Sequence, residues 1–203
     1  MKIQVVDNFY PADLIQDLDV KSDTYPWTFS RSDSNEDVYW TVQIYGDYYY
    51  KTKNLKEENF TKNEVKMLWD YFSSKFKVGF EHLGSCYLNG LTHGIEAHAH
   101  IDESSTGHTT VIFYLCDGWN LHWGGETVFF NKEFVKDPTD ESYYNNEIIK
   151  SVLPRNNRMV LFDSHITHAV RPISITYKGL RKTLMFKLRN ISIDELMERH
   201  ICN

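Results

Sequence analysis

The spacing of hydrophobic positions divides the chain into a first part with helices and a longer second part rich in strands. Residues 61–76 repeat apolar side chains every three or four positions, which is the period of an amphipathic helix. These side chains are Val65, Leu68, Phe72 and Phe76. Thr61 and Glu64 stand at the two positions of a capping box, which predicts where this helix begins. Shorter helices are expected after Pro11, because proline suits a first helical turn, and over residues 191–200.

Short apolar runs predict strands through most of the remaining chain. Glycine and asparagine residues break these runs and mark the turns between them. The expected strands cover residues 2–6, 27–29, 38–42, 78–90, parts of 98–130, 147–154, 158–162 and 180–190. Short strands that follow a helical N-terminal part predict a mainly β fold with flanking helices, of the β-sandwich or jelly-roll type.

Length and composition favour one folded domain. A chain of 203 residues can build a single core. With 41% hydrophobic and 15% aromatic residues, it should be folded rather than disordered and rich in strands. We therefore expect one domain over 1–203, with supporting strands and helices in 1–77, the catalytic core in 78–190 and a C-terminal helix in 191–203.

Charge and cysteine content narrow the functional classes. A net charge of -6 argues against a general nucleic-acid binder, although a local basic groove could hide within that sum. Cys86, Cys116 and Cys202 show no metal-binding spacing, and their odd number predicts free thiols in a reducing compartment. The polar start predicts no signal peptide, and no stretch has the length of a membrane span. A cytoplasmic protein without a membrane partner is expected.

Residues 100–102 (HID) and the distant segment 161–172 (LFDSHITHAVRP) carry the candidate chemistry. Residues two apart in an extended strand face the same side, so His100 and Asp102 could share one metal ion. His98 would lie on the same face and competes as a ligand. In the second segment His168 is the best placed imidazole, and His165 competes with it. Two histidines and one carboxylate on one side of an ion are the ligands expected for a non-haem Fe(II) oxygenase.

An ordered series of short motifs extends this pattern over most of the chain. In sequence order the motifs are Tyr87-Leu88-Asn89-Gly90, His100-Ile101-Asp102, Val111-Ile112-Phe113-Tyr114-Leu115 with Asp117-Gly118-Trp119, Gly124-Gly125-Glu126-Thr127, Val160-Leu161-Phe162 with His168-Ala169-Val170-Arg171-Pro172, and Gly179-Leu180-Arg181. From Cys86 to Leu188 this series resembles the 2-oxoglutarate- and Fe(II)-dependent dioxygenases, in particular their prolyl 4-hydroxylase-like branch. The resemblance implies a double-stranded β-helix core, which is the jelly roll also found in cupins.

The resemblance also implies roles for individual residues. It makes His100, Asp102 and His168 the metal ligands, because valine and proline follow His168 in the family manner. It places Arg181 on the carboxylate of 2-oxoglutarate that lies far from the metal. Arginine suits this role because its planar fork matches a carboxylate. The family often uses lysine there, and Lys182 is adjacent, but strand alternation lets only one of the two face the pocket.

Two tyrosines and a glycine turn complete the implied site. Tyr114 and Tyr87 fall where the family places tyrosines near the cosubstrate, and a packing role in the core is the alternative for both. Gly124 and Gly125 are expected to form a turn and to allow a close strand approach rather than to take part in the chemistry.

The implied activity is hydroxylation of a C–H bond, with 2-oxoglutarate converted to succinate and CO2. Fe(II), 2-oxoglutarate and O2 are the implied cofactors and cosubstrates, with ascorbate as a candidate stimulant. The branch points to a prolyl residue of a protein or peptide, and a free amino acid or other small molecule is the alternative. Two weaker alternatives are oxidative dealkylation of nucleic acids, at which Arg181 followed by Lys187 and Arg189 hints, and a non-catalytic metal-binding β-sandwich.

Overall fold

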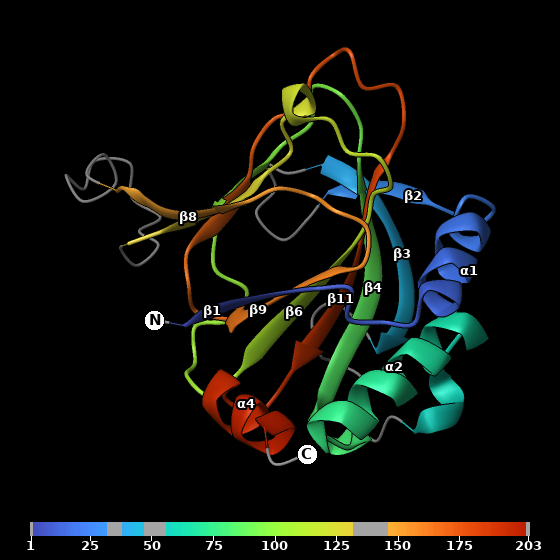
Figure 1. The fold of residues 1–203 in the computed structure, drawn as a ribbon, viewed down its shortest axis with the longest axis vertical. Helices are drawn as coiled ribbons and strands as arrows, with labels where there is room; N and C mark the ends of the chain where they lie inside the picture. Colours follow the sequence, from blue (N-terminus) through green and yellow to red (C-terminus); the bar gives the residue numbers. More distant parts are fainter. Residues whose placement is uncertain (1, 32–37, 47–55, 132–145, 202–203) are drawn as a thin grey trace.

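A computed structural model describes residues 2–31, 38–46, 56–131 and 146–201 (Figure 1). Two antiparallel sheets form its centre. The larger has the strand order β1-β9-β6-β11-β4-β3-β2, and the smaller has the order β5-β10-β7-β8. The strands of the larger sheet are β1 (Ile3–Asp7), β2 (Thr28–Arg31), β3 (Val38–Gly46), β4 (Leu83–Leu91), β6 (Thr109–Leu115), β9 (Arg158–Asp163) and β11 (Arg181–Leu188). Those of the smaller sheet are β5 (Ala97–His100), β7 (Thr127–Phe130), β8 (Ile148–Val152) and β10 (His168–Val170).

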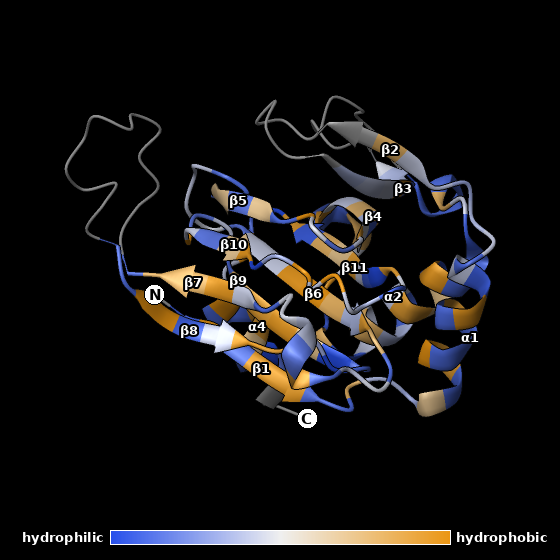
Figure 2. Ribbon diagram, turned by 90° about the horizontal axis from the view of Figure 1, so that it is seen from above, coloured by the Kyte–Doolittle hydropathy of each residue, from blue (hydrophilic) through white to orange (hydrophobic). Residues whose placement is uncertain are grey.

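Helices cover one face of the larger sheet, and the smaller sheet covers the other, as the view from above in Figure 2 shows. The helices are α1 (Ala12–Ser22), α2 (Asn63–Phe76) and α4 (Ile193–Ile201), with short 3-10 turns η1 (Glu57–Asn59), η2 (Phe80–His82) and η3 (Leu121–Trp123). Strand β11 is central and pairs with β4 on one side and β6 on the other. The expected mainly β jelly roll with flanking helices is confirmed.

Strand alternation gives the larger sheet two different apolar faces. One face packs on the helices and forms the main core, in which Leu68, Trp69 and Phe72 of α2 meet Phe113 and Phe186 of the sheet. The opposite face forms a second cluster with the smaller sheet, where Phe129 and Val152 pack with residues that include Tyr114 and Phe162. The space between the two sheets therefore holds an apolar cluster of its own.

Helix α2 begins without the predicted capping box. The residue that precedes the helix is Lys62, and no side chain caps the first turn. Thr61 instead donates its hydroxyl to the carbonyl of Ile44 at 3.2 Å, and Glu64 accepts a hydrogen bond from Tyr25. Contacts with strand β3 and with the bend after α1 therefore replaced the local bonds that the sequence pattern favoured.

The cysteines and helices bear on the expected surroundings of the protein. Cys86 and Cys116 are free thiols and buried, while Cys202 lies outside the described residues. None of the helices in the described part of the chain combines the length and the apolar character that a membrane span requires.

Candidate active site

Three side chains from two distant segments of the chain meet between the two sheets. His100 ends β5 and pairs directly with His168, the first residue of β10. Asp102 follows two residues after His100. One ligand atom from each of the three lies within 4.8 Å of the other two. Antiparallel pairing of β5 with β10 thus places two imidazoles next to each other, and the chain after β5 adds the carboxylate.

Asp102 does not lie in a strand, so the expected alternation does not explain its position. Strand β5 ends at His100, and Asp102 stands in a bend. Its backbone N–H donates to the carbonyl of Ser164 at 2.9 Å. Thr110 donates its hydroxyl to Asp102 Oδ2 at 2.6 Å, and Lys187 forms an ion pair with the same oxygen. Contacts with a distant turn and two central strands therefore position this carboxylate.

Backbone carbonyls orient both imidazoles. His100 Nδ1 lies 2.7 Å from the carbonyl of His98, and His168 Nδ1 lies 2.9 Å from the carbonyl of Ile166. A carbonyl can only accept, so each Nδ1 carries the proton and each Nε2 keeps a free lone pair. The two Nε2 atoms face Asp102, with His100 Nε2 at 3.7 Å from Oδ1 and His168 Nε2 at 3.7 Å from Oδ2. Such bonds are the usual way in which proteins hold metal-binding histidines.

Burial and charge set the protonation of the three groups. Burial lowers the pKa of His168 to about 4, so this imidazole is neutral near pH 7. Burial alone would raise the pKa of Asp102, but Lys187, His168 and His100 together hold it well below its usual value. For His100, burial acts against protonation, but the nearby carboxylate of Asp102 outweighs it and raises the pKa. The carboxylate is therefore ionised and ready to bind a cation.

The competing histidines lie outside the group of three. The side chain of His98 is exposed rather than lining the pocket, and it is the carbonyl of this residue that contacts His100. His165 is half-buried, and its Nδ1 has no hydrogen-bond partner among the described residues. Of the two imidazoles in the 161–172 segment, His168 is the one that meets His100 and Asp102.

Arg181 is a buried cation at the back of the same space. Its side chain is 1% exposed and donates from Nε to the carbonyl of Gly125 at 2.8 Å and from Nη2 to the hydroxyl of Thr127 at 3.2 Å. No carboxylate forms an ion pair with Arg181 in the part of the chain that the structure describes. Because burying a charge without a counter-ion is costly, this guanidinium is suited to an anionic ligand.

Lys182 points to the opposite face of β11, toward helix α1. Its ammonium group forms ion pairs with Asp19 at 2.6 Å and with Asp23 at 2.7 Å. It also donates to the hydroxyl of Ser22 at 3.0 Å. Of the two adjacent cations, the one in the space between the sheets is Arg181, and Lys182 joins the end of α1 to the central strand.

The glycine turn explains how Arg181 is held. Gly125 has φ +73°, and a Cβ atom at this position would lie 3.0 Å from the ring of Trp119 and 3.2 Å from Cδ of Arg181. Only glycine adopts this conformation without strain and leaves room for both side chains. The close approach lets the Gly125 carbonyl reach the guanidinium.

The two candidate tyrosines occupy different places. Tyr87 lines the cavity that holds the three metal-site residues. Tyr114 lies one layer deeper, where it is fully buried and its hydroxyl shares a 2.6 Å hydrogen bond with Thr127. The guanidinium carbon of Arg181 lies 5.2 Å from the centre of the Tyr114 ring. Tyr114 therefore supports Arg181 and Thr127 rather than lining the cavity.

Sequence reasoning missed the roles of Thr110 and Lys187. Lys187 had suggested contact with nucleic acid, but this residue is buried and its ammonium group forms an ion pair with Asp102. It cannot reach a phosphate backbone, and neither can the buried Arg181. Alternation along β11 could have predicted that Lys187 faces the same side as Arg181, six positions earlier. It could not have predicted that Asp102 is the partner of Lys187.

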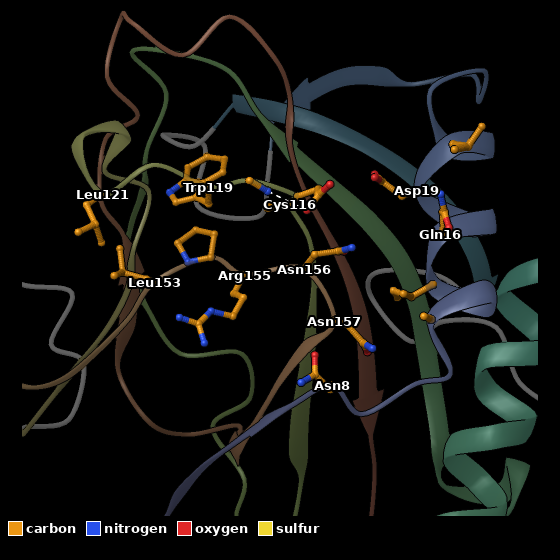
Figure 3. Close-up of a pocket in the computed structure, with 16 residues that line it drawn as sticks. Asn8, Gln16, Asp19, Cys116, Trp119, Leu121, Leu153, Arg155, Asn156 and Asn157 are labelled. Atoms are coloured by element: carbon orange, nitrogen blue, oxygen red, sulfur yellow. Dashed lines mark hydrogen bonds between the residues drawn. The ribbon is translucent and has the colours of Figure 1, made fainter.

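A larger cavity lies elsewhere in the described part of the chain. A space of about 700 Å³ lies between α1, the 116–121 loop and the 153–157 turn, with Arg155, Asn156 and Trp119 among its lining residues (Figure 3). It contains none of the three candidate metal ligands. The metal-site cavity is much narrower, about 50 Å³. Its apolar and aromatic lining consists of Tyr39, Tyr87, Leu91, Ala97, Ile112, Val170 and Met185.

The donor set fits a ferrous ion with a dicarboxylate beside it. Two histidines with free Nε2 atoms and one ionised carboxylate suit Fe(II) and leave further coordination positions open. The unpaired cation Arg181 lines the same cavity and suits the far carboxylate of a bound diacid. The residues present thus match both an iron ion and 2-oxoglutarate.

Comparisons with known proteins agree with this chemistry. The sequence model of the 2OG-Fe(II) oxygenase superfamily matches residues 85–186, which is half of the chain and includes all four site residues just described. No curated protein sequence matches the chain significantly.

Solved structures share the fold. A prolyl hydroxylase from Trichoplax adhaerens, in complex with a peptide fragment, is 16% identical with a TM-score of 0.63, covering 99% of this chain and 86% of that one. A prolyl-4-hydroxylase from Pseudomonas putida is 18% identical with a TM-score of 0.56, covering 92% and 91%. HygX from Streptomyces hygroscopicus, with nickel, 2-oxoglutarate and hygromycin B bound, is 10% identical with a TM-score of 0.61, covering 92% and 82%.

At these identities the likeness to solved structures concerns the fold. The match to the superfamily goes further, because it spans half of the sequence and contains the three candidate metal ligands and the buried arginine. The chain therefore belongs to the 2OG-Fe(II) oxygenase superfamily, the dioxygenases that use Fe(II), 2-oxoglutarate and O2.

Proposed function

We propose that this dioxygenase hydroxylates a prolyl residue of a protein or peptide and releases succinate and CO2. In this proposal His100, Asp102 and His168 bind the iron, and Arg181 binds the far carboxylate of 2-oxoglutarate. The observation that carries the assignment is that these three ligands and one unpaired buried cation line a single narrow cavity.

Each residue has a task that follows from its surroundings. When bound, Fe(II) and 2-oxoglutarate supply the oxidising chemistry. The carbonyls that fix both Nδ1 protons keep His100 Nε2 and His168 Nε2 directed at the ion. Thr110 and Lys187 occupy Asp102 Oδ2 and leave Oδ1 for the metal. The proposed site is therefore preorganised before any ligand enters.

Arg181 orients the cosubstrate. Gly125 and Thr127 fix two of its nitrogens, so the guanidinium cannot rotate freely. A carboxylate that binds this fixed cation holds the opposite end of 2-oxoglutarate toward the metal ligands. Tyr114 supports this arrangement from behind, and Tyr87, which lines the cavity, is the tyrosine that we place next to the cosubstrate.

The side chains that line the cavity favour a substrate group without charge. Apart from Arg181 and the three metal-site residues, no charged side chain lines this cavity among the described residues. A free amino acid carries an ammonium and a carboxylate and would need a partner for each. A prolyl residue within a peptide carries neither, and its apolar ring suits the side chains of Tyr39, Leu91 and Val170.

The structurally similar proteins support a peptide substrate, and they leave a small-molecule substrate as the alternative. The Trichoplax adhaerens prolyl hydroxylase holds a peptide fragment on the same fold. HygX holds hygromycin B, so the same architecture also accepts a small molecule. Hydroxylation of a free amino acid or other small molecule therefore remains the second candidate.

Two linked assays test the proposal. The purified protein, supplied with Fe(II), ascorbate and 2-oxoglutarate, is expected to form succinate, and a panel of proline-containing peptides should accelerate this reaction. Mass spectrometry of the peptides should show a gain of one oxygen atom on proline. Oxygen gain on free amino acids but on no peptide would overturn the peptide assignment. Asp102→Ala is the matched inactive control.

A further inference from the structure

Lys187 is an unusual neighbour for a metal site. It lies on β11, on the same face as Arg181, and its ammonium group forms an ion pair with Asp102 Oδ2. Both side chains are buried, with 6% of the lysine and 7% of the aspartate side chain exposed. Thr110 lies 3.4 Å from the ammonium nitrogen and is its other polar contact among the described residues. Lysine is almost never buried without such a partner.

The ion pair affects the charge that a metal ion meets. Asp102 is the anionic member of the three candidate ligands, and the ammonium group already neutralises its charge. A divalent cation bound to Asp102 would therefore lie close to a positive charge in a buried site, where like charges repel strongly. The same positive charge would attract a dianionic ligand that approaches the metal.

We propose that Lys187 is a built-in counter-ion that weakens binding of the metal alone and strengthens binding of 2-oxoglutarate to the metal-loaded protein. Metal and cosubstrate then bind cooperatively, because each supplies a charge that the other requires. This inference rests on the proposed roles of Asp102 and its two histidine partners, and it adds a charged residue that acts through Asp102.

A role only in orienting Asp102 is less consistent with the contacts. The hydroxyl of Thr110 already holds Oδ2 at 2.6 Å, and the backbone of Asp102 is fixed by the Ser164 carbonyl at 2.9 Å. Removing the ammonium group would leave the carboxylate in place but without its counter-ion. A buried, uncompensated carboxylate should bind a cation more tightly.

Lys187→Met tests the inference because methionine has a similar length and no charge, and it adapts to its surroundings. Isothermal titration calorimetry measures the binding of Mn²⁺ alone and then of 2-oxoglutarate to the Mn²⁺-loaded protein. The variant is expected to bind Mn²⁺ about tenfold more tightly and 2-oxoglutarate about tenfold more weakly, which is a typical coupling between two sites. Lys187→Arg, which keeps the charge, should resemble the natural protein in both measurements.

The outcomes separate the inference from the proposed function. Equal or weaker Mn²⁺ binding by Lys187→Met, with 2-oxoglutarate still bound, would overturn the inference alone. No binding of Mn²⁺ by either protein would overturn the proposed metal site and the inference with it. If Lys187→Met does not fold, Lys187→Gln repeats the comparison with a polar side chain that can still donate to Asp102.

Discussion

Two side chains of the metal-site cavity differ from a nearby residue of the same type of charge or ring in the groups that they contact. Arg181 is buried without a carboxylate partner among the described residues, whereas Lys182, one position later, has two. His168 meets Asp102, whereas His165, three positions earlier, does not. Each pair offers a test in which one residue should matter for ligand binding and its neighbour should not.

The two histidines provide the first test. His168→Ala should abolish binding of Mn²⁺ and succinate formation, because it removes one of the three proposed metal ligands. His165→Ala should retain both, since this side chain lies outside the group of ligands. Calorimetric titration with Mn²⁺ measures the difference. Full metal binding by His168→Ala, with loss in His165→Ala, would show that the wrong imidazole has been assigned.

Arg181 provides the second test. Arg181→Ala should weaken the binding of 2-oxoglutarate about tenfold to a hundredfold, which corresponds to the loss of ~1.5–3 kcal/mol in hydrogen bonds to a charged group. Binding of Mn²⁺ should remain, because Arg181 is not one of the metal ligands. Titration of the Mn²⁺-loaded variant with 2-oxoglutarate gives the affinity, and an unchanged value would contradict the assigned role.

Single elements show which parts of the site can be predicted from sequence and which cannot. Along β11, alternation was enough to expect that Arg181 and Lys182 point to opposite faces. After β5 the same rule failed for Asp102, because the strand ends at His100 and contacts with Ser164 and Thr110 set the carboxylate.

Long-range partners were the general obstacle to sequence reasoning. The capping box expected at Thr61 was displaced by a bond to β3, and the partner of Lys187 is on a loop far away in sequence. Spacing along the chain indicates which face a residue occupies, but not which distant group it meets. The candidate ligand set could be proposed from the sequence because it depends on residue type and on short motifs.

Helix α1 depends on β11 through Lys182, which gives a prediction for stability. Lys182→Met should lower the free energy of unfolding by ~1–2 kcal/mol. This loss is smaller than for a fully buried ion pair, because water screens the partly exposed carboxylates of Asp19 and Asp23. Binding of 2-oxoglutarate should persist. Urea denaturation measures the stability, and a variant with natural stability but lost cosubstrate binding would indicate that Lys182, not Arg181, serves the pocket.

For the molecule as a whole, two apolar clusters, one on each face of the larger sheet, stabilise the fold. The helices close the first cluster, and the smaller sheet closes the second around the metal site. Cys86 lies in the first and Cys116 in the second. Burial raises the pKa of Cys116 to about 11 and that of Cys86 well above its usual value.

These buried thiols predict low reactivity of the folded protein. In a Cys202→Ser variant, Cys86 and Cys116 should react with a thiol reagent at pH 8 only as fast as the protein opens, because the thiolate is the reactive form. Addition of urea should expose both at once. Rapid labelling of the native variant would contradict the tight packing of the two clusters.

The central claim is that His100, Asp102 and His168 bind one metal ion while Arg181 binds the far end of 2-oxoglutarate. A crystal structure with Mn²⁺ and 2-oxoglutarate, recorded with anomalous scattering, tests it most directly. We predict one manganese peak in contact with His100 Nε2, Asp102 Oδ1 and His168 Nε2, and a cosubstrate carboxylate on the Arg181 guanidinium. A manganese ion bound elsewhere, or a cosubstrate that does not contact Arg181, would contradict the account.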